Sequence, residues 1–193
     1  MTDKDQLTGE EGEYLLSVAR QTIEEALFHR TGEPTEGGSG FSSKFSERRG
    51  TFVTLTMDGQ LRGCIGHIIP QESLIEGVKI NAINAAFRDP RFRPLAREEF
   101  DKIQIEVSIL TEPKPLAYED GNDLLMKLRP GVDGLIIKKG ARQATFLPQV
   151  WEQLPDKKAF LTHLCLKAGL DADEWTRGEL RVSTYQVQAF EEE

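Results

Sequence analysis

A cysteine and an arginine lie two residues apart in the stretch LRGCIG, which spans residues 61–66. A thiol acts as a nucleophile in its thiolate form, and a neighbouring guanidinium stabilises that form. Side chains alternate along a strand, so an extended chain here directs Arg62 and Cys64 to the same face. Glycine is costly inside a strand unless something approaches the backbone closely, which makes Gly63 and Gly66 candidate ligand-binding positions. The stretch therefore predicts a site built on Cys64 and Arg62.

Three roles for Cys64 fit these residue types: a nucleophile or covalent carrier, a residue that lines a ligand site without reacting, and a small buried side chain in a tightly packed hairpin. A catalytic thiol needs a base, but His67 points to the opposite face of a regular strand and reaches the thiol only through a bend near Gly66. A zinc site built on Cys64 and His67 has two of the usual four ligands, so no metal is expected. The second cysteine, Cys165, lies at helical spacing from apolar neighbours and is expected in the core.

A strand predicted over residues 102–111 carries two further polar candidates. Its apolar residues alternate with Glu106 and Ser108, which therefore share the other face. If that face borders the site, Glu106 orients Arg62 or acts as a general base. The alternative is a solvated carboxylate. Ser108 is a candidate ligand-binding residue on the same face.

The segment 87–95 is a basic cluster in an acidic chain, and it is too rich in proline for a helix. Arginines hold a phosphate or carboxylate through two parallel hydrogen bonds, so Arg88 and Arg91 are candidate ligand-binding residues, with Arg93 beside them. The alternative is a rigid loop fixed by Arg–Asp pairs. Far along the chain, Gln149 follows a proline and adds a candidate polar contact.

Composition excludes several classes of protein. The 193 residues carry a formal net charge of −8 and the isoelectric point is near 5.1, which argues against a nonspecific nucleic-acid binder. No apolar run approaches the roughly 20 residues of a membrane span, and the first residues lack the basic and apolar regions of a secretory signal. Two cysteines are too few for a disulfide framework. We therefore expect a cytoplasmic protein with reduced thiols and no membrane partner.

Periodicity predicts an α+β fold with antiparallel sheets. The expected elements are helices at residues 10–29, 72–87, 120–128 and 156–170, hairpins at 51–68 and 135–146, and single strands at 102–111 and 180–190. Helix, hairpin, helix and strand occur twice in this order, which suggests a structural duplication. Thr8 is expected to cap the first helix, with Glu11 completing a capping box. The Gly- and Ser-rich residues 31–48 are expected to form a flexible surface loop.

The signature LRGCIG resembles that of the AMMECR domain family, the A component of AmmeMemoRadiSam systems. The match continues in AAFRDPRF, IEVSIL, PGVDGL, TFLPQVW and LKAGL, at residues 85–92, 105–110, 130–135, 145–151 and 166–170. These blocks are long, ordered and spread over residues 10–190, so the resemblance covers nearly the whole chain. On this basis residues 1–193 are expected to form a single AMMECR-type domain.

The resemblance implies two unequal lobes with antiparallel sheets, flanking helices and a cleft lined by the signature residues. It brings no established activity and no known cofactor, and it implies two partners in a modification pathway, a Memo-like protein and a radical SAM enzyme. The first functional hypothesis is an enzyme or enzyme component that uses Cys64, with Arg62 and Glu106, to modify a protein, nucleotide or RNA substrate. The second is a non-catalytic ligand-binding or scaffold protein of that pathway. In either case the arginines favour a phosphate-bearing small molecule or RNA as the ligand.

Overall fold

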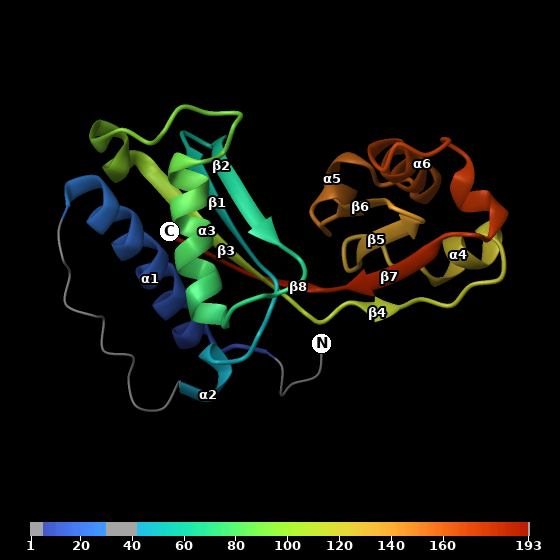
Figure 1. Ribbon diagram of the computed structural model, residues 1–193, viewed down its shortest axis with the longest axis horizontal. Helices are drawn as coiled ribbons and strands as arrows, with labels where there is room; N and C mark the ends of the chain where they lie inside the picture. The colour runs from blue at the N-terminus through green and yellow to red at the C-terminus, as the bar shows by residue number, and fades with distance from the viewer. Residues whose placement is uncertain (1–5, 30–41, 193) are drawn as a thin grey trace. The chain divides into compact units, whose positions relative to one another are not determined.

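The computed structural model describes residues 6–29 and 42–192. The chain divides into two compact units, of which unit 1 comprises Met1–Leu110 and Gln188–Glu193 and unit 2 comprises Thr111–Val187 (Figure 1). Helices flank two four-stranded antiparallel sheets, so the fold is α+β as predicted. Most of the expected flexible loop lies outside the described residues.

Unit 1 contains the first set of elements. Its helices are α1 (Gly9–Phe28), α2 (Ser42–Phe45), α3 (Leu74–Phe87) and the 3-10 helix η1 (Arg97–Lys102), and its strands are β1 (Thr51–Met57), β2 (Gln60–His67), β3 (Ile103–Leu110) and β8 (Val187–Glu191). The strand order is β2-β1-β3-β8, which places β2 at an edge of the sheet. The helix α2 and the 3-10 helix η1 were not predicted, because such short elements carry no periodic apolar pattern.

Two predicted local features of unit 1 are confirmed. The hydroxyl of Thr8 accepts the backbone N–H of Glu11, and the Glu11 carboxylate accepts the backbone N–H of Thr8, which is the predicted capping box. The turn between β1 and β2 has positive φ at both Asp58 (52°) and Gly59 (73°). Those angles suit a two-residue hairpin turn, because they match the twist of the flanking strands.

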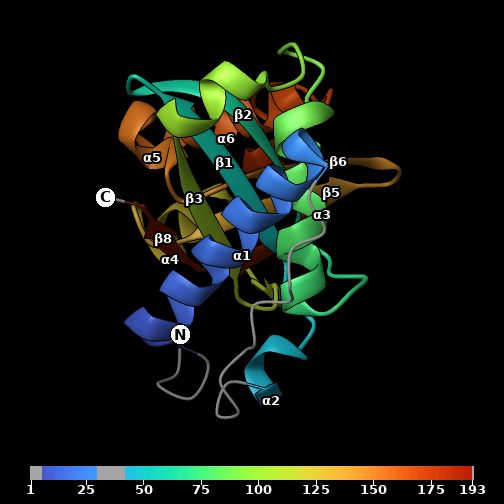
Figure 2. The ribbon, with the colours of Figure 1, turned by 90° about the vertical axis from the view of Figure 1, so that its left-hand side faces the viewer.

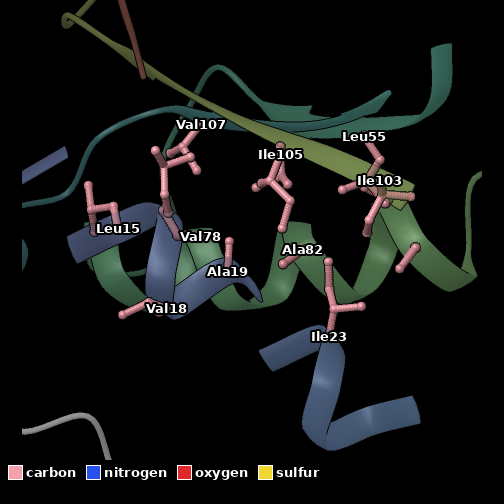
Figure 3. Close-up of a cluster of buried hydrophobic side chains, with 14 of the residues drawn as sticks. Leu15, Val18, Ala19, Ile23, Leu55, Val78, Ala82, Ile103, Ile105 and Val107 are labelled. Carbon is pink, nitrogen blue, oxygen red and sulfur yellow. The ribbon is translucent and has the colours of Figure 1, made fainter. Parts of the chain in front are cut away.

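The core of unit 1 lies between its sheet and two helices. Figure 2 shows α1 and α3 on the same side of β1, β2 and β3, and Figure 3 shows apolar side chains meeting between these layers. The labelled members, none more than 3% exposed, are Leu15, Val18, Ala19 and Ile23 of α1, Val78 and Ala82 of α3, Leu55 of β1, and Ile103, Ile105 and Val107 of β3. The intervening strand residues point to the opposite face of the sheet, which we call the far face.

Unit 2 is organised around its own sheet and core. Its elements are β4 (Lys114–Pro115), α4 (Gly121–Lys127), β5 (Gly134–Lys139), β6 (Arg142–Phe146), α5 (Val150–Gln153), α6 (Lys157–Lys167), the 3-10 helix η2 (Glu174–Arg177) and β7 (Arg181–Tyr185), with strand order β4-β7-β5-β6. In the core, Trp151 stacks on Phe160 with ring centroids 3.6 Å apart, and the indole N–H donates to the backbone carbonyl of Asp133 at 2.8 Å.

The final predicted strand is two strands in two different sheets. The chain leaves β7 at Gln186, whose backbone N–H donates to the Thr111 hydroxyl and whose carbonyl accepts the Thr111 N–H, both at 2.9 Å. It then enters unit 1 as β8. The apolar positions change parity along this stretch, from Leu180 and Val182 to Tyr185 and Val187. A change of parity does not by itself show that the chain moves to another sheet. The two sheets share one arrangement, because β2, β1 and β3 are neighbours in that order in unit 1, and β6, β5 and β7 are neighbours in that order in unit 2. In each unit these are the second and first strands of the hairpin and the next strand of the chain. The suggested duplication stays a prediction.

Candidate functional site

Cys64 lies in a row of three residues that crosses the far face. Cys64 on β2 pairs with Thr54 on β1, and Thr54 pairs with Glu106 on β3. Directly opposed residues in antiparallel strands have Cβ atoms about 5 Å apart. Cys64, Thr54 and Glu106 are all partly exposed. The sheet thus brings a thiol, a hydroxyl and a carboxylate into one line.

The hydroxyl of Thr54 donates to the Cys64 sulfur across 3.3 Å. Cys64 is a free thiol. Sequence reasoning missed Thr54, because threonine is ordinary in a strand and only the pairing register shows which one meets the cysteine.

Two side chains from the loop after α3 hold the backbone of Cys64 at the outer edge of β2. Its N–H donates to Oδ2 of Asp89 at 2.9 Å, and its carbonyl accepts from Nη2 of Arg91 at 3.2 Å. Arg91 also donates to both carboxylate oxygens of Asp89, at 3.0 and 2.7 Å. Because β2 is an edge strand, the Asp89–Arg91 pair takes the place of a neighbouring strand at Cys64.

Asp89 is charged in this position even though its side chain is only 1% exposed. The hydrogen bond from Arg91 holds the pKa of Asp89 well below its usual range, against the opposing effect of burial, and the N–H groups of Cys64 and Arg91 add to the lowering. A buried carboxylate is stable when it is paired and hydrogen-bonded in this way. The Asp89–Arg91 pair, which we call the clamp, therefore remains ionised in the folded protein.

Much of the basic segment serves the protein's own structure. Arg91 is bonded to Asp89, and Arg88 donates to the Asn84 side chain at 3.3 Å. These pairs correspond to the rigid-loop alternative for residues 87–95. A role for Arg88 and Arg91 in binding a ligand stays a prediction.

A β-bulge interrupts the hairpin at Arg62. Leu55 pairs with Gly63 and Thr56 pairs with Leu61, so Arg62 has no partner in the register. An extra residue in one strand breaks the regular alternation of side chains. The regular alternation from which Arg62 and Cys64 were expected to share a face is therefore interrupted at Arg62.

Arg62 is paired with Glu99 of η1 and not with Glu106, for which orienting Arg62 was one of the roles considered. Its Nε and Nη2 donate to the two Glu99 oxygens at 2.9 and 2.8 Å, and the residue is 9% exposed. The Arg62 hydrogen bond lowers the pKa of Glu99 to about 2, and the hydrogen bond to Glu99 raises the pKa of Arg62. The pair ties β2 to the segment after α3, which gives Arg62 a structural task.

Glu106 is oriented by a neighbour on its own strand. The hydroxyl of Ser108 donates to Oε1 of Glu106 at 2.8 Å, and Ser108 is 1% exposed. The two residues share a face of β3, as predicted. A carboxylate held in this way next to Thr54 is placed to accept a proton, and that role stays a prediction.

Packing accounts for the two glycines of the signature. A Cβ on Gly63 would lie 2.2 Å from the carbonyl oxygen of Ala85 in α3. A Cβ on Gly66 would lie 2.3 Å from both the ring of Phe52 and the carbonyl oxygen of Thr51. The close approach that a strand glycine predicts is thus supplied by the protein's own backbone and core.

The remaining candidates lie away from the Cys64 row. His67 pairs with Thr51 on the helix side of the sheet, and its Nε2 lies 2.8 Å from Oε1 of Glu72. Cys165 is fully buried in the core of unit 2, as predicted, and burial raises its pKa. Gln149 belongs to unit 2 and precedes α5; its Oε1 is buried without a partner among the residues described.

Within residues 6–29 and 42–192, no group of three or more His, Cys, Asp or Glu side chains is arranged to hold a metal ion.

These features define a class: a two-unit α+β protein with an antiparallel sheet in each unit and a cysteine clamped on an edge strand. The chain belongs to the AMMECR1 family, whose profile matches residues 16–190. It is 45% identical over 188 residues to Protein Mbar_A1807 of Methanosarcina barkeri, covering 96% of this chain and 92% of that one. It is 43% identical to a protein of Methanothermobacter thermautotrophicus, covering 97% of each.

A solved structure shares the fold. The crystal structure of uncharacterized protein PH0010 from Pyrococcus horikoshii matches with a TM-score of 0.82 and 38% sequence identity, covering 94% of this chain and 91% of that one. In the part of the chain that the structure describes, no helix is long and apolar enough to cross a membrane.

Proposed function

We propose that the protein is an enzyme, or a component of one, in which the Cys64 thiol is the reactive group in the modification of a protein, nucleotide or RNA substrate. One observation carries this proposal. Cys64 is partly exposed, its sulfur receives a hydrogen bond from Thr54 at 3.3 Å, and the residue lies in a row that ends at Glu106.

Each member of the row has a task in this proposal. Thr54 stabilises the thiolate by donating its hydroxyl hydrogen. Glu106, fixed by Ser108, accepts a proton during the reaction. The Asp89–Arg91 clamp fixes the strand from which the thiol projects, so the nucleophile is held in one geometry before the substrate arrives. The pKa of Arg91 is raised chiefly by its hydrogen bond to Asp89, against the opposing effect of burial.

The second cysteine gives an internal control for a test. Cys165 is completely buried and its pKa is raised, so it is expected to be inert in the folded protein. Native protein is treated with iodoacetamide for increasing times, and the two alkylated peptides are measured by mass spectrometry. Cys64 is expected to react at least about tenfold faster than Cys165. Equal rates in folded protein would remove the reactive-thiol proposal.

A non-catalytic ligand-binding or scaffold role is the second candidate, favoured by one observation: among the described residues, the hydrogen-bond donor to the Cys64 sulfur is a hydroxyl, not an imidazole or ammonium group. The two candidates differ in their response to substitution. Cys64→Ser abolishes the function of an enzyme while leaving the fold intact, whereas a scaffold tolerates Cys64→Ser. Gly63→Val does not separate the two, because a side chain at Gly63 would clash with the carbonyl oxygen of Ala85 in either case.

The proposed setting is a cytoplasmic modification pathway with a Memo-like protein and a radical SAM enzyme as partners. This part rests on the family resemblance and on the absence of a membrane-crossing helix among the described residues. Affinity purification of tagged protein from its source organism, with Cys64→Ser as a second bait, tests it. Both baits are expected to retain the radical SAM enzyme, because the substitution is on the sheet face and not in the clamp.

A further inference from the structure

An open cavity of about 700 Å³ lies at the end of the unit 1 sheet where β1 ends and β3 begins. Its lining residues come from α1, the β1–β2 turn, the end of η1, the start of β3 and the segment after β8: Arg20, Asp58, Asp101, Lys102, Ile103, Gln104 and Glu192. The cavity is open to solvent, and six of its seven lining residues are polar or charged. The function proposed above does not use this cavity.

Two of the charged lining residues are committed to each other. Arg20 donates to both carboxylate oxygens of Glu192 at 2.5 Å, and also to the carbonyl oxygens of Phe100 and Ile103. The Glu192 carboxylate accepts the backbone N–H of Ile105 at 2.9 Å as well. This pair forms a fixed wall, in which Arg20 uses four of its five N–H donors on the protein itself.

The remaining polar lining residues are available to a ligand. Asp58, Asp101, Lys102 and Gln104 are exposed, and their side chains make no hydrogen bond or ion pair with the residues described. Asp58 and Asp101 bring two negative charges to the lining, and Lys102 brings one positive charge. The charge of Asp101 also helps to raise the pKa of Arg20, and the charge of Lys102 helps to lower the pKa of Glu99. The available charge is therefore negative, which favours a cation over a phosphate.

The strand register connects this cavity to the Cys64 row. Gln104 pairs with Thr56, and two residues further along β3 Glu106 pairs with Thr54, which in turn pairs with Cys64. Two residues along a strand span about 7 Å, and two strand spacings span about 10 Å. Gln104 is thus about 12 Å from Cys64 across the far face. An extended chain covers that distance in about three to four residues.

We propose that the substrate of the Cys64 site is a peptide segment of a protein, which places a lysine or arginine side chain in the cavity lined by Asp58, Asp101 and Gln104. The basic residue lies three to four residues from the group that meets the thiol. This inference rests on the function proposed above and selects protein from the three substrate classes named there. A nucleic acid or nucleotide would place phosphates beside the unpaired carboxylates.

Binding in the cavity is tested without any reaction at the thiol. Backbone amide spectra of ¹⁵N-labelled Cys64→Ser protein are recorded while a pentapeptide with one central arginine, or AMP, is added. The peptide is expected to shift the amide signals of Asp58, Asp101 and Gln104 to saturation, and AMP is expected to leave them unchanged. Asp101→Asn should weaken peptide binding several-fold. The matched control is Glu98→Gln, which removes one exposed charge of η1 outside the cavity lining.

The spacing is tested with reactive peptides. Each carries an N-terminal chloroacetyl group and a single arginine two, three, four or six residues from it. The Cys64 thiolate attacks the methylene carbon that carries the chlorine, a C–S bond forms, and chloride leaves. The peptides with arginine at three and four residues are expected to label Cys64 at least about tenfold faster than the peptide at six, and Asp101→Asn should remove that preference.

The outcomes separate this inference from the function on which it rests. A thiol that fails the iodoacetamide test leaves the amide-shift result intact, because that measurement uses Cys64→Ser. The inference is overturned if the arginine peptide shifts none of the cavity amides, if AMP shifts the same amides, or if Glu98→Gln weakens binding as much as Asp101→Asn. It is also overturned if labelling is independent of the arginine position while Cys64 remains reactive.

Discussion

The carboxylate of Asp89 accepts the backbone N–H of Cys64 at 2.9 Å, although the two residues are 25 positions apart in the chain. Together with Arg91, Asp89 satisfies the outward-facing donor and acceptor of an edge-strand residue. An unpaired strand edge invites pairing with other chains, and proteins block such edges with charged side chains. Here the block is located at the cysteine, so the same contacts protect the sheet edge and fix the thiol.

Asp89→Ala should destabilise the protein by about 3 kcal/mol, because it leaves the N–H of Cys64 unsatisfied and the Arg91 guanidinium without its anion. Urea unfolding measures the free energy of unfolding. Asp171→Asn is the control, because its carboxylate is 71% exposed and contacts Arg177 at 3.4 Å, and its cost should stay below about 0.5 kcal/mol. Similar losses for both variants would show that the clamp contributes little.

Thr54→Val removes the hydroxyl that donates to the Cys64 sulfur and preserves the shape of the side chain. The iodoacetamide rate at Cys64 is expected to fall about threefold to tenfold at fixed pH, because the thiolate loses a hydrogen-bond donor. Thr56→Val, one row further along the same face of β1, is the matched control and should leave the rate unchanged. An unaffected rate in Thr54→Val would mean that the hydroxyl does not stabilise the thiolate.

The Arg62–Glu99 pair predicts how stability depends on pH. The pKa of Glu99 falls from its ordinary value of 4.5 to about 2 in the folded protein. A depressed carboxyl pKa stabilises the fold above the unfolded value, and this stabilisation is lost as the pH falls through the folded value. The loss attributable to Glu99 should therefore occur between about pH 4.5 and pH 2.

Urea unfolding of wild-type protein and Glu99→Gln at pH 7, 4.5, 3 and 2 checks this. The difference between the two proteins should be largest at pH 7 and should shrink toward pH 2. A difference that stays constant over this range would argue against a charged Glu99 in the fold. Asp89 titrates in the same direction, but it is present in both proteins and cancels in the comparison.

Gly63→Ala should destabilise unit 1 by at least about 2 kcal/mol, because the new methyl group would overlap the carbonyl oxygen of Ala85 and α3 would have to move. The measurement is the midpoint of thermal unfolding. Gly9→Ala is the control, because nothing lies within 4 Å of its added Cβ and alanine favours a helix more than glycine does. A tolerated Gly63→Ala would point to a helix that can shift away from β2.

Local patterns in the sequence predicted the local structure of this protein well. The Asp-Gly turn, the alternation of β1 and β3 and the capping box at Thr8 depend on neighbours within a few residues, and each is confirmed. The pairing of Glu106 with Ser108 was accessible for the same reason, because residues two apart on a strand share a face.

The contacts that define the site depend on long-range geometry, which one sequence does not contain. Arg62 pairs with Glu99 and not with Glu106. The β-bulge at Arg62 adds one residue to β2 and interrupts the regular alternation of its side chains. Thr54 and Asp89 reach Cys64 through strand register and a loop return. Register and bulges are decided by the packing of the whole sheet, and residue types alone left several choices open.

Strand β8 follows unit 2 in the chain but completes the sheet of unit 1. During synthesis, one edge of β3 therefore stays unpaired until all of unit 2 has been made. Unit 1 cannot complete its sheet before unit 2 is synthesised, although domains generally fold in order from the N-terminus. The Arg20–Glu192 pair forms last for the same reason. A ribosome that stalls after unit 2 would hold a nascent chain with an exposed strand edge, which is a state that chaperones recognise.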